Sequence, residues 1–480
     1  MDRRKSQSAG HFEGPIRRCS AEELRIALGD LEGGGSGGLA LRLIGLLRDL
    51  IRTGDMPSGT LMPPSRSVAD VFGVSRGVVV AAYEQLLAEG FLLARQGAGT
   101  WVADSVTRAS PAPPQLSAPA PVARPGLPDL SGFPRTKWLA SYRHALSTMG
   151  NADLSYGDPR GHQKLRVELA GHLRRTRGAV VDPELMLVVN GVAEGLALLA
   201  DVLTATGRQR IAVEDPASPG TRDLMAGLGL DVVGIPVDHE GIMVDSVQEP
   251  GRLGAVLLTP AHQYPTGVLL SAPRRRALID LARAHDVLLI EDDYDGAFRY
   301  NRDPVGCLQG LAPDVTVLLG SVSKTLAPAL RLGWMTGPQT WHQRLVERRA
   351  TTNGSGQAMD QLAFAHMLLT GNYDRHVRQM RRNYHARRSH LVAELAATAS
   401  DIVVRGDASG LHLLAELPPG VDESTVLALL RGNGFDVQGL AECRLVSPPD
   451  ARGGLIIGYA ALTPASITRL VSLLAQVTGC

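Results

Sequence analysis

The sequence predicts an α/β protein with a small N-terminal helical module and a large C-terminal body. The sheet of the body is expected to be mostly parallel, with helices on both faces and a smaller α+β subdomain at its C-terminal end. Three observations carry this prediction. A proline-rich segment interrupts the chain once, two short helical patterns meet at a glycine before it, and apolar strands alternate with helices after it.

Length and composition bound the class of protein. A chain of 480 residues is too long for one core, and 44% hydrophobic with 20% charged residues is typical of a soluble globular protein. The 49 basic and 48 acidic residues nearly cancel, so binding to nucleic acid must come from locally placed side chains. No signal peptide and no long apolar run is apparent, which predicts a cytoplasmic protein without a membrane partner. The four cysteines are widely spaced, which predicts neither a disulfide framework nor a metal cluster.

The segment 104–128 holds seven prolines among small and polar residues. Such a composition buries too little apolar surface to fold, so we interpret it as a linker. The predicted organisation is therefore an N-terminal extension at 1–37, a module at 38–103, the linker at 104–128 and the body at 129–480.

The module contains the pattern of a helix-turn-helix. A first helix is expected from residue 39 to Gly54, a short helix from Ser65 to Phe72, a turn at Gly73, and a second short helix that Ser75 can cap. The residues after Gly90 predict two short strands around 96–99, which would form a wing. Two short helices joined at a glycine place the second helix in a DNA major groove, although a plain helical bundle has the same spacing.

The charges of the module favour DNA only through their position. Residues 39–102 carry a net charge of about +1, which is only a weak electrostatic indication of DNA binding. Arg66 and Arg76, however, each stand at the start of a helix, where side chain and helix N-terminus can both meet a phosphate. The basic residues near the chain start are interpreted as a solvated tail, with nonspecific DNA contacts as the alternative; they are Arg3, Arg4, Lys5, Arg17 and Arg18.

The stretch "SGTLMPPSRSVADVFGVSRGVVVAAYEQLLAEGFLLARQGAGTWVA" resembles the winged helix-turn-helix of the GntR superfamily. The resemblance implies binding to double-stranded operator DNA. It also implies that the serine–arginine pair, the start of the recognition helix and the wing approach the DNA, here Ser65, Arg66, Ser75, Arg76, Gly97, Gly99 and Thr100.

Five apolar strands of the body each end in a polar loop: "LMLVVNGVAEG", "RIAVEDPASPG", "GAVLLTPAHQYPTG", "VLLIEDDYDGAFRY" and "VTVLLGSVSK". In parallel sheets, ligands bind beyond the carboxyl ends of the strands, so these loops are expected to converge on one site.

The residues in these loops suit pyridoxal 5′-phosphate (PLP). Lys324 can form a Schiff base with an aldehyde, Asp292 can keep a pyridine nitrogen protonated, and Tyr294 can donate to a ring oxygen. A phosphate can be held by the following groups: Ser321, Ser323, Arg331 and the amides of Val192 and Ala193. Taken singly, each residue has a structural alternative, such as a helix cap for the aspartate or a surface ion pair for Arg331.

The body resembles fold-type I aminotransferases, and the whole chain resembles MocR-type transcriptional regulators. The matching segments are "VEDP", "TPAHQYPTG", "EDDYDGAFRY", "SVSKTLAPALRLGW" and "HVRQMRRNYHARR". The resemblance implies that Lys324 carries PLP, that Asp292 and Tyr294 bind its ring nitrogen and phenolic oxygen, and that Tyr264 lies in the cofactor loop. Asp293 competes with Asp292 for the nitrogen. A head-to-tail homodimer is also implied.

Three positions depart from the aminotransferase pattern. Ser218 stands where an aromatic residue usually stacks on the pyridine ring. Tyr264 replaces the asparagine before Pro-Thr-Gly. Ile456 lies near the place of the arginine that grips the substrate carboxylate, and Arg444 or Arg452 could substitute for it.

These features predict a PLP-dependent, DNA-binding transcriptional regulator, rather than an enzyme, whose body senses PLP or an amino compound that reacts with it. Two alternatives stay open. One is a working aminotransferase with an accessory DNA-binding module, and the other is a regulator whose body does not bind PLP.

Overall fold

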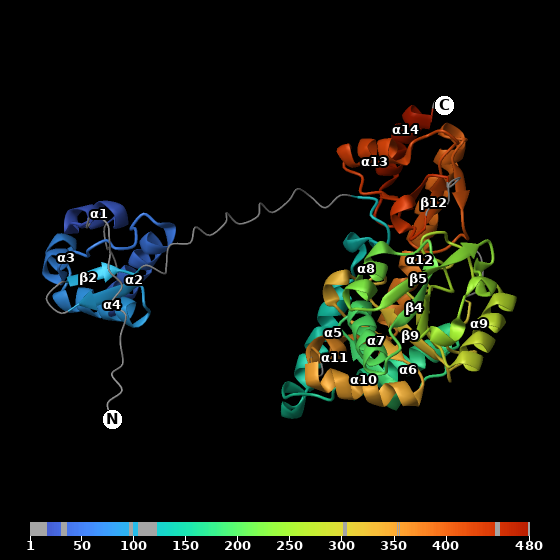
Figure 1. Ribbon diagram of the computed structural model, residues 1–480, viewed down its shortest axis with the longest axis horizontal. Coiled ribbons are helices and arrows are strands. Elements are labelled where there is room, and N and C mark those ends of the chain that lie inside the picture. Colours follow the sequence, from blue (N-terminus) through green and yellow to red (C-terminus); the bar gives the residue numbers. More distant parts are fainter. Residues whose placement is uncertain are drawn as a thin grey trace, which may run out of the picture. The chain divides into compact units, whose positions relative to one another are not determined.

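The computed structural model describes residues 17–29, 36–95, 99–103, 122–300, 305–352, 354, 356–446 and 452–478. The chain divides into two compact units, Met1–Ala118 and Pro119–Cys480, which we call the N-terminal and the C-terminal unit (Figure 1).

The N-terminal unit is a helical bundle with a two-stranded hairpin. Its elements are α1 (Ala21–Leu28), α2 (Ser36–Thr53), α3 (Ser65–Phe72), α4 (Arg76–Ala88), β1 (Leu92–Arg95) and β2 (Gly99–Val102). Leu43, Leu47 and Leu86 are buried in one apolar cluster. Gly73 ends α3 in the left-handed conformation at φ 64°, which allows the tight turn into α4. The predicted helix-turn-helix and hairpin are confirmed.

Helix α1 lies inside the segment that the sequence assigned to an extension. Ser20 caps it, because the Ser20 hydroxyl accepts from the Glu23 amide at 3.1 Å and the Glu23 carboxylate accepts from the Ser20 amide at 2.8 Å. Residues just before it pair with Leu61, whose amide donates to the Arg17 carbonyl at 2.8 Å. The backbone of Arg17 and Arg18 is therefore not part of a free tail, because the hydrogen bonds of Arg17 and Cys19 to Leu61 attach it to the unit, although both arginine side chains are exposed.

The C-terminal unit is built on an eight-stranded sheet in the order β3-β10-β9-β8-β7-β4-β5-β6. Strands β5, β4, β7, β8 and β9 are mutually parallel, whereas β10 is antiparallel to both β9 and β3, and β6 is antiparallel to β5. The strands are β3 (Met186–Val189), β4 (Arg210–Asp215), β5 (Asp231–Asp238), β6 (Gly241–Ile242), β7 (Ala255–Leu258), β8 (Leu288–Asp292), β9 (Thr316–Ser321) and β10 (Gly333–Thr336).

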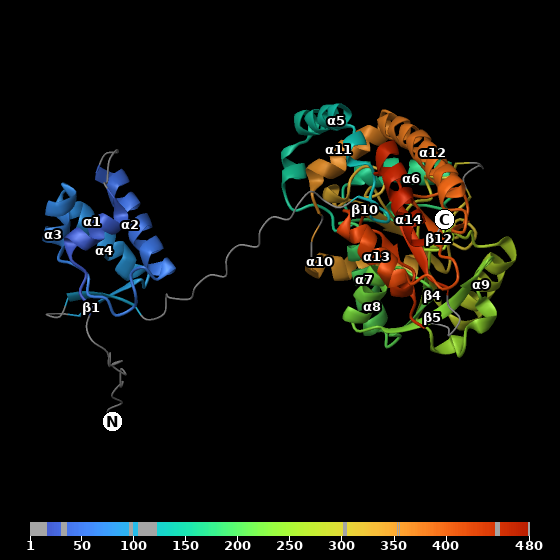
Figure 2. The same cartoon turned by 90° about the horizontal axis from the view of Figure 1, so that it is seen from above.

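Helices cover both faces of this sheet, as expected for parallel β–α units. One face packs on α7 (Val192–Ala205), α8 (Pro219–Gly227) and α10 (Gln339–Thr352). The other packs on α6 (Gln163–Arg177), α9 (Ala272–His285) and α11 (Ala358–Leu369). In both views α7 and α9 lie on opposite sides of β4 (Figure 1, Figure 2). Helix α5 (Arg135–Thr148) packs against α11.

A second, antiparallel sheet forms the C-terminal subdomain, in the order β11-β12-β14-β13. Its strands are β11 (Val403–Arg405), β12 (His412–Glu416), β13 (Gln438–Gly439) and β14 (Gly454–Gly458). The apolar core of this subdomain includes residues of α12 (Asn372–Thr398), α13 (Glu423–Gly432) and α14 (Pro464–Thr478).

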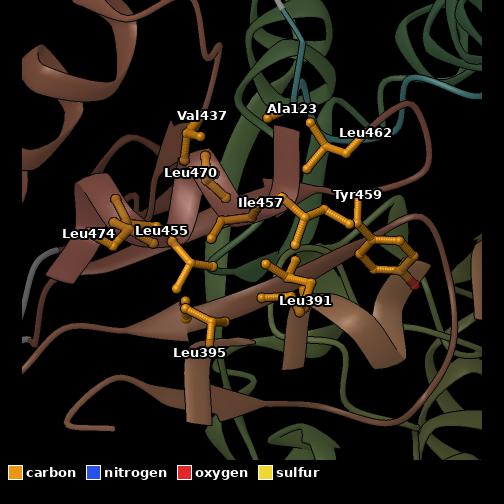
Figure 3. Packing of buried hydrophobic residues seen from close by; sticks show 14 of the residues in the cluster. Ala123, Leu391, Leu395, Val437, Leu455, Ile457, Tyr459, Leu462, Leu470 and Leu474 are labelled. Atoms are coloured by element: carbon orange, nitrogen blue, oxygen red, sulfur yellow. The ribbon is translucent and has the colours of Figure 1, made fainter. Parts of the chain in front are cut away.

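The last seven residues of the predicted linker are part of the C-terminal unit. We call Val122–Pro128 the strap. The Val122 carbonyl accepts from the Asp436 amide at 2.8 Å, and the Ala123 carbonyl accepts from the Gly458 amide at 2.9 Å. Ala123 is fully buried in the cluster that contains Ile457 (Figure 3). Composition alone placed the strap in the linker, but its backbone hydrogen bonds and this one small apolar residue attach it to the subdomain.

Candidate functional site

The polar loops at the carboxyl ends of the strands converge on one cavity of about 410 Å³. Every residue that the sequence predicted for the cofactor lines it: Val192, Ala193, Tyr264, Asp292, Tyr294, Ser321, Ser323, Lys324 and Arg331. These residues come from four different loops that are far apart in the sequence. The sheet topology therefore brings an amine, a carboxyl, two phenols, two hydroxyls and a guanidinium to a single place.

Lys324 follows β9, and its side chain lies against the strap. A Cβ atom built on Gly126 would lie 2.9 Å from Lys324 Nζ, and Gly126 has φ 71°, a backbone conformation that favours glycine. Burial lowers the pKa of Lys324, while the nearby carboxyls of Asp292 and Asp295 oppose that shift. A lysine with a lowered pKa holds more of its amine in the neutral, nucleophilic form.

The acidic pair at the end of β8, Asp292 and Asp293, divides between two environments. Asp293 binds Arg177 with both carboxylate oxygens, at 2.7 and 2.8 Å. Asp292 lines the cavity instead, and its Oδ1 is buried without a hydrogen-bond partner among the described residues. Burial, with the charge of Asp293 as the next cause, raises the pKa of Asp292 to about 7. In the structure, Asp292 is therefore the carboxyl available to a ligand.

Tyr294 is held by a neighbouring loop. Its hydroxyl donates to the carbonyl of His262 at 3.0 Å and lies 3.0 Å from His262 Nδ1. His262 Nδ1 in turn lies 2.8 Å from Oδ2 of Asp295, and both of these side chains are almost fully buried. Burial raises the pKa of Tyr294 well above its ordinary value, so the phenol keeps its proton.

The N-terminus of α7 forms the end of the cavity that suits a phosphate group. Gly191 precedes the helix at φ 88°, and the Val192 and Ala193 residues begin it. Arg331 lies beside this turn, because its Nη2 donates to the Asn190 carbonyl at 2.8 Å. Backbone amides at a helix start, the helix dipole and a guanidinium together suit a phosphate group.

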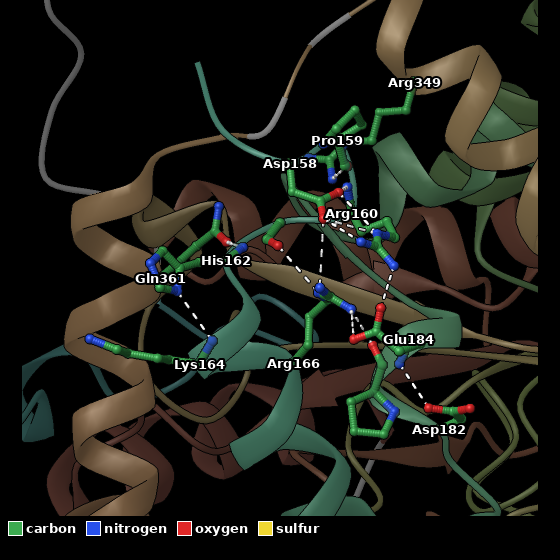
Figure 4. A network of polar contacts seen from close by, with 12 residues as sticks. Asp158, Pro159, Arg160, His162, Lys164, Arg166, Asp182, Glu184, Arg349 and Gln361 are labelled. Atoms are coloured by element: carbon green, nitrogen blue, oxygen red, sulfur yellow. Dashed lines mark hydrogen bonds and ion pairs between the residues drawn. The ribbon is translucent and has the colours of Figure 1, made fainter. Parts of the chain in front are cut away.

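The buried side chain of Arg349 holds this turn through Glu194. Glu194 in the first turn of α7 accepts from the Asn190 amide and from Nε of Arg349 at 3.3 Å. Arg349 also donates to the carbonyl of Pro159 at 2.6 Å, and Pro159 belongs to the polar network around Asp158, Arg160 and Arg166 (Figure 4). The arginine compensates an acidic side chain that would otherwise repel an anion at this helix end.

The three departures noted in the sequence have clear positions. Ser218, the N-cap residue of α8, lines the cavity and supplies no aromatic ring there. The Tyr264 hydroxyl donates to Gln438, and the ring packs beside Ile456, which is fully buried. Arg444 donates to the carbonyl of Arg452 at 3.3 Å, and neither arginine lines the cavity.

Several lining residues were not predicted. Pro125 and Gly126 belong to the strap, whose composition resembled a linker. Glu214 accepts from the amide and the hydroxyl of Thr259 at 2.9 and 2.7 Å, and burial raises its pKa to about 7. Its position in "VEDP", at the carboxyl end of an apolar strand, was the available signal. Arg222 also lines the cavity, from α8.

The residues predicted to meet DNA lie in the N-terminal unit. Ser65 and Arg66 begin α3, and Arg76 begins α4. Nε of Arg76 is 3.4 Å from the Ser65 hydroxyl, so the starts of the two helices lie side by side. Ser75 is the N-cap residue of α4, without a side-chain capping bond. Gly99, at φ 100°, and Thr100 lie on β2, and Gly97 lies outside the described residues.

Two family models match this chain. Residues 39–102 match "Bacterial regulatory proteins, gntR family", and residues 129–474 match "Aminotransferase class I and II". Among curated proteins, this chain is 34% identical to the HTH-type pyridoxine biosynthesis transcriptional regulator PdxR of Corynebacterium glutamicum over 422 residues. The alignment covers 86% of this chain and 90% of that protein. This chain is 31% identical over 446 residues to the probable rhizopine catabolism regulatory protein MocR of Rhizobium meliloti, covering 87% and 89%.

Among solved structures, the C-terminal unit has the fold of a kynurenine aminotransferase from Pyrococcus horikoshii. The TM-score is 0.68 with 21% identity, and the match covers 76% of this chain and 91% of that chain. At this identity the likeness shows the fold alone. No helix among the described residues has the length and apolar character to cross a bilayer.

Proposed function

The chain belongs to the MocR-type transcriptional regulators, in which a GntR-family module precedes an aminotransferase class I and II domain, and from this membership we propose a PLP-dependent mode of regulation. In this proposal the N-terminal unit binds operator DNA. The C-terminal unit binds PLP through Lys324 and senses either PLP itself or an amino compound that reacts with it.

One observation carries the cofactor part of the proposal. Nine residues expected from the sequence to hold PLP line a single cavity, and the buried Oδ1 of Asp292 lacks any partner among the described residues. A buried carboxyl oxygen without a partner costs free energy, which a ligand that donates a hydrogen bond would recover. The residues present therefore fit the cofactor.

Each side chain has a proposed role. Lys324 holds the cofactor covalently, Asp292 accepts from the pyridine nitrogen, and Tyr294 donates to the phenolic oxygen. The start of α7, with Ser321, Ser323 and Arg331, binds the phosphate, and Tyr264 closes the remaining wall. When bound, PLP would supply an aldehyde that exchanges between Lys324 and an effector amine, which gives the site a chemical basis for sensing.

The proposed DNA contacts are those of the N-terminal unit. The exposed side chains of Arg66 and Arg76 would bind phosphates at the starts of α3 and α4, assisted by Ser65 and Ser75. Gly99 and Thr100 on β2, with Gly97, would bring the wing close to the DNA backbone. These contacts position the module and do not by themselves define the operator.

We further propose a head-to-tail homodimer. Large apolar side chains are exposed on α5 and the following turn: Leu139 (50%), Leu146 (49%), Leu154 (62%) and Tyr156 (104%). A second copy of the chain is the natural cover for such a surface. Light scattering of the purified protein tests whether a dimer forms, and a monomeric mass would overturn this proposal.

The decisive experiment for the cofactor is a visible absorption spectrum of the protein with added PLP, followed by borohydride reduction and peptide mapping. We expect adduct mass on the peptide that contains Lys324 and no adduct in Lys324→Ala. Operator binding is then compared with and without PLP. A wild-type protein that stays colourless would overturn the PLP proposal and favour a regulator with another ligand.

A further inference from the structure

A buried hydrogen-bonded chain lies behind Tyr294 and is not explained by cofactor binding alone. Asp295, which is 1% exposed in its side chain, lies 2.8 Å from Nδ1 of His262, which is 3% exposed. The same Nδ1 is 3.0 Å from the Tyr294 hydroxyl. Burying a carboxylate and an imidazole costs free energy of desolvation. A pair that is retained despite this cost is a candidate for a specific role.

The hydrogen bonds that link Asp295, His262 and Tyr294 have a definite direction. An ionised carboxylate only accepts hydrogen bonds, so the proton of a neutral His262 must be on Nδ1, directed at Asp295. The Tyr294 hydroxyl lies close enough to accept from the same N–H. Its own proton is directed at the His262 carbonyl, 3.0 Å away. Tyr294 has a single proton to donate, so this proton must turn from the His262 carbonyl to the cofactor when PLP binds, while the hydroxyl oxygen continues to accept from His262.

This direction decides what Tyr294 can do in the cavity. A hydroxyl that accepts a hydrogen bond becomes a stronger donor, because the two bonds polarise each other. If the proton were on Nε2 instead, the free lone pair of Nδ1 would accept from Tyr294 and compete for its proton. Asp295 prevents this competition by fixing the tautomer of His262, much as the carboxylate of an Asp-His pair orients the imidazole in other sites.

We propose that Asp295 and His262 are positioning residues for Tyr294, and that they set the strength of the hydrogen bond which Tyr294 donates to the phenolic oxygen of the cofactor. This inference rests on the proposed function for its effect on PLP. The position of the proton on His262, which Asp295 fixes, does not depend on PLP.

Groups from every surrounding element bear on the titration of this site. Tyr294 is faced by His262 and Tyr264 from the loop after β7, Asp292 and Asp295 around the end of β8, and His412 from β12. Lys324, which follows β9, lines the same cavity and interacts electrostatically with Asp292, Asp295 and His412. The His412 ring lies 5.1 Å from that of His262, and burial lowers its pKa well below the ordinary value. His412 is thus neutral and adds no charge to the chain.

The first test uses the pH midpoint of the visible band of the PLP-loaded protein. A hydrogen bond to the phenolic oxygen of the cofactor withdraws negative charge from that oxygen. The Lys324 nitrogen joined to the cofactor, which lies next to this oxygen, then becomes less basic. Tyr294→Phe should therefore raise the midpoint. Asp295→Leu and His262→Leu should raise it in the same direction by a smaller amount, about half to one pH unit. His262→Asn retains an N–H near the position of Nδ1 and should stay close to wild type.

The outcome that overturns the proposal is equally specific. A midpoint in Asp295→Leu and His262→Leu equal to that of wild type, while Tyr294→Phe moves it, would show that the pair is only structural. Metal bound stoichiometrically to wild type and lost from the His262 variants would also overturn it, since the ligand atoms of His262, Asp295 and His412 lie within 4.8 Å of one another.

A second test separates this inference from the proposed function. The ¹⁵N NMR spectrum of histidine-labelled protein without PLP reports the tautomer of His262 directly. We expect protonation at Nδ1 in wild type and at Nε2 in Asp295→Leu. Protonation at Nε2 in wild type would refute the inference even if PLP binds, whereas the expected tautomers in a protein that never binds PLP would refute only the cofactor proposal.

Discussion

Gly126 lies directly against the amine of Lys324, so that a single added methyl group would lie 2.9 Å from Nζ. The strap that contains Gly126 is held at one end by the C-terminal subdomain, through Gly458 and Asp436. Just after its other end, Asp129 binds Arg387 of α12 at 2.7 Å. The chain segment that leads toward the N-terminal unit is therefore also a wall of the cavity.

We expect Gly126→Ala to weaken PLP binding. The added Cβ would lie 2.9 Å from Nζ, so the flexible end of Lys324 must move away from the position it has in the cavity, which we expect to cost about 1 kcal/mol, or roughly fivefold in affinity. An absorption titration with PLP measures the change. Gly420→Ala is the matched control, because Gly420 has φ 86° but no atom within 4 Å of the added Cβ. Equal PLP affinity in both variants would contradict the contact.

Asp292→Asn should stabilise the protein without PLP at alkaline pH. The pKa of Asp292 is raised to about 7 in the folded state, against about 3.9 unfolded, so its stabilising contribution is complete below pH 4 and is lost as pH rises to about 7. We expect the variant to gain about 1–3 kcal/mol over wild type at pH 8 and nothing at pH 4, measured by urea unfolding.

The same substitution should weaken PLP binding, because the amide cannot supply the charge that a protonated pyridine nitrogen needs. Asp293→Asn serves as the contrast. It removes the partner of buried Arg177 and should lower the free energy of unfolding at both pH values. A pH profile of Asp292→Asn that is parallel to wild type would refute the assignment of this carboxyl.

Ser218→Tyr should tighten PLP binding. Ser218 lines the cavity and makes no capping bond, so its loss removes no hydrogen bond from α8. An aromatic pair contributes about 0.5–1.5 kcal/mol, which corresponds to roughly 2- to 12-fold in the dissociation constant. Ser218→Ala should show no gain. A weaker complex in the tyrosine variant would mean that this wall does not face the ring.

Arg66→Ala and Arg76→Ala should each weaken operator binding and reduce its salt dependence. Every phosphate contact removed should lower the slope of log affinity against log salt by about 0.9. Fluorescence anisotropy of labelled DNA over a range of salt concentrations measures this slope. Arg52→Ala, which removes the same charge from α2, should leave the slope nearly unchanged, because Arg52 lies over the Phe91 ring. A similar loss in all three variants would indicate a purely diffuse charge effect.

Much of the fold and of the cavity follows from the sequence, because apolar strands that end in polar loops must converge in a parallel sheet. Lys324, Tyr294 and Arg331 could be brought together on that basis. The choice between Asp292 and Asp293 could not be made, since successive residues of a strand point to opposite faces and only the position of Arg177 decides which face is paired.

Other features depend on tertiary contacts that no local pattern reveals. Gly126 is a lining residue only because the strap crosses Lys324, and nothing in a proline-rich composition indicates such a crossing. Helix α1 is different, since Ser20 and Glu23 have the spacing of a capping box and could have been identified. The role of His262 required its distance from Asp295.

The burial of α1 determines where the DNA-binding part of the chain can be cut for separate study. Leu24 is fully buried in the same cluster as Val68 of α3, and the Arg17 carbonyl is hydrogen-bonded to Leu61 just ahead of that helix. A fragment that begins at residue 38, where the periodic pattern starts, would expose this apolar surface and aggregate. A fragment that begins before Arg17 and continues past Ala103 retains the complete core for work with isolated operator DNA.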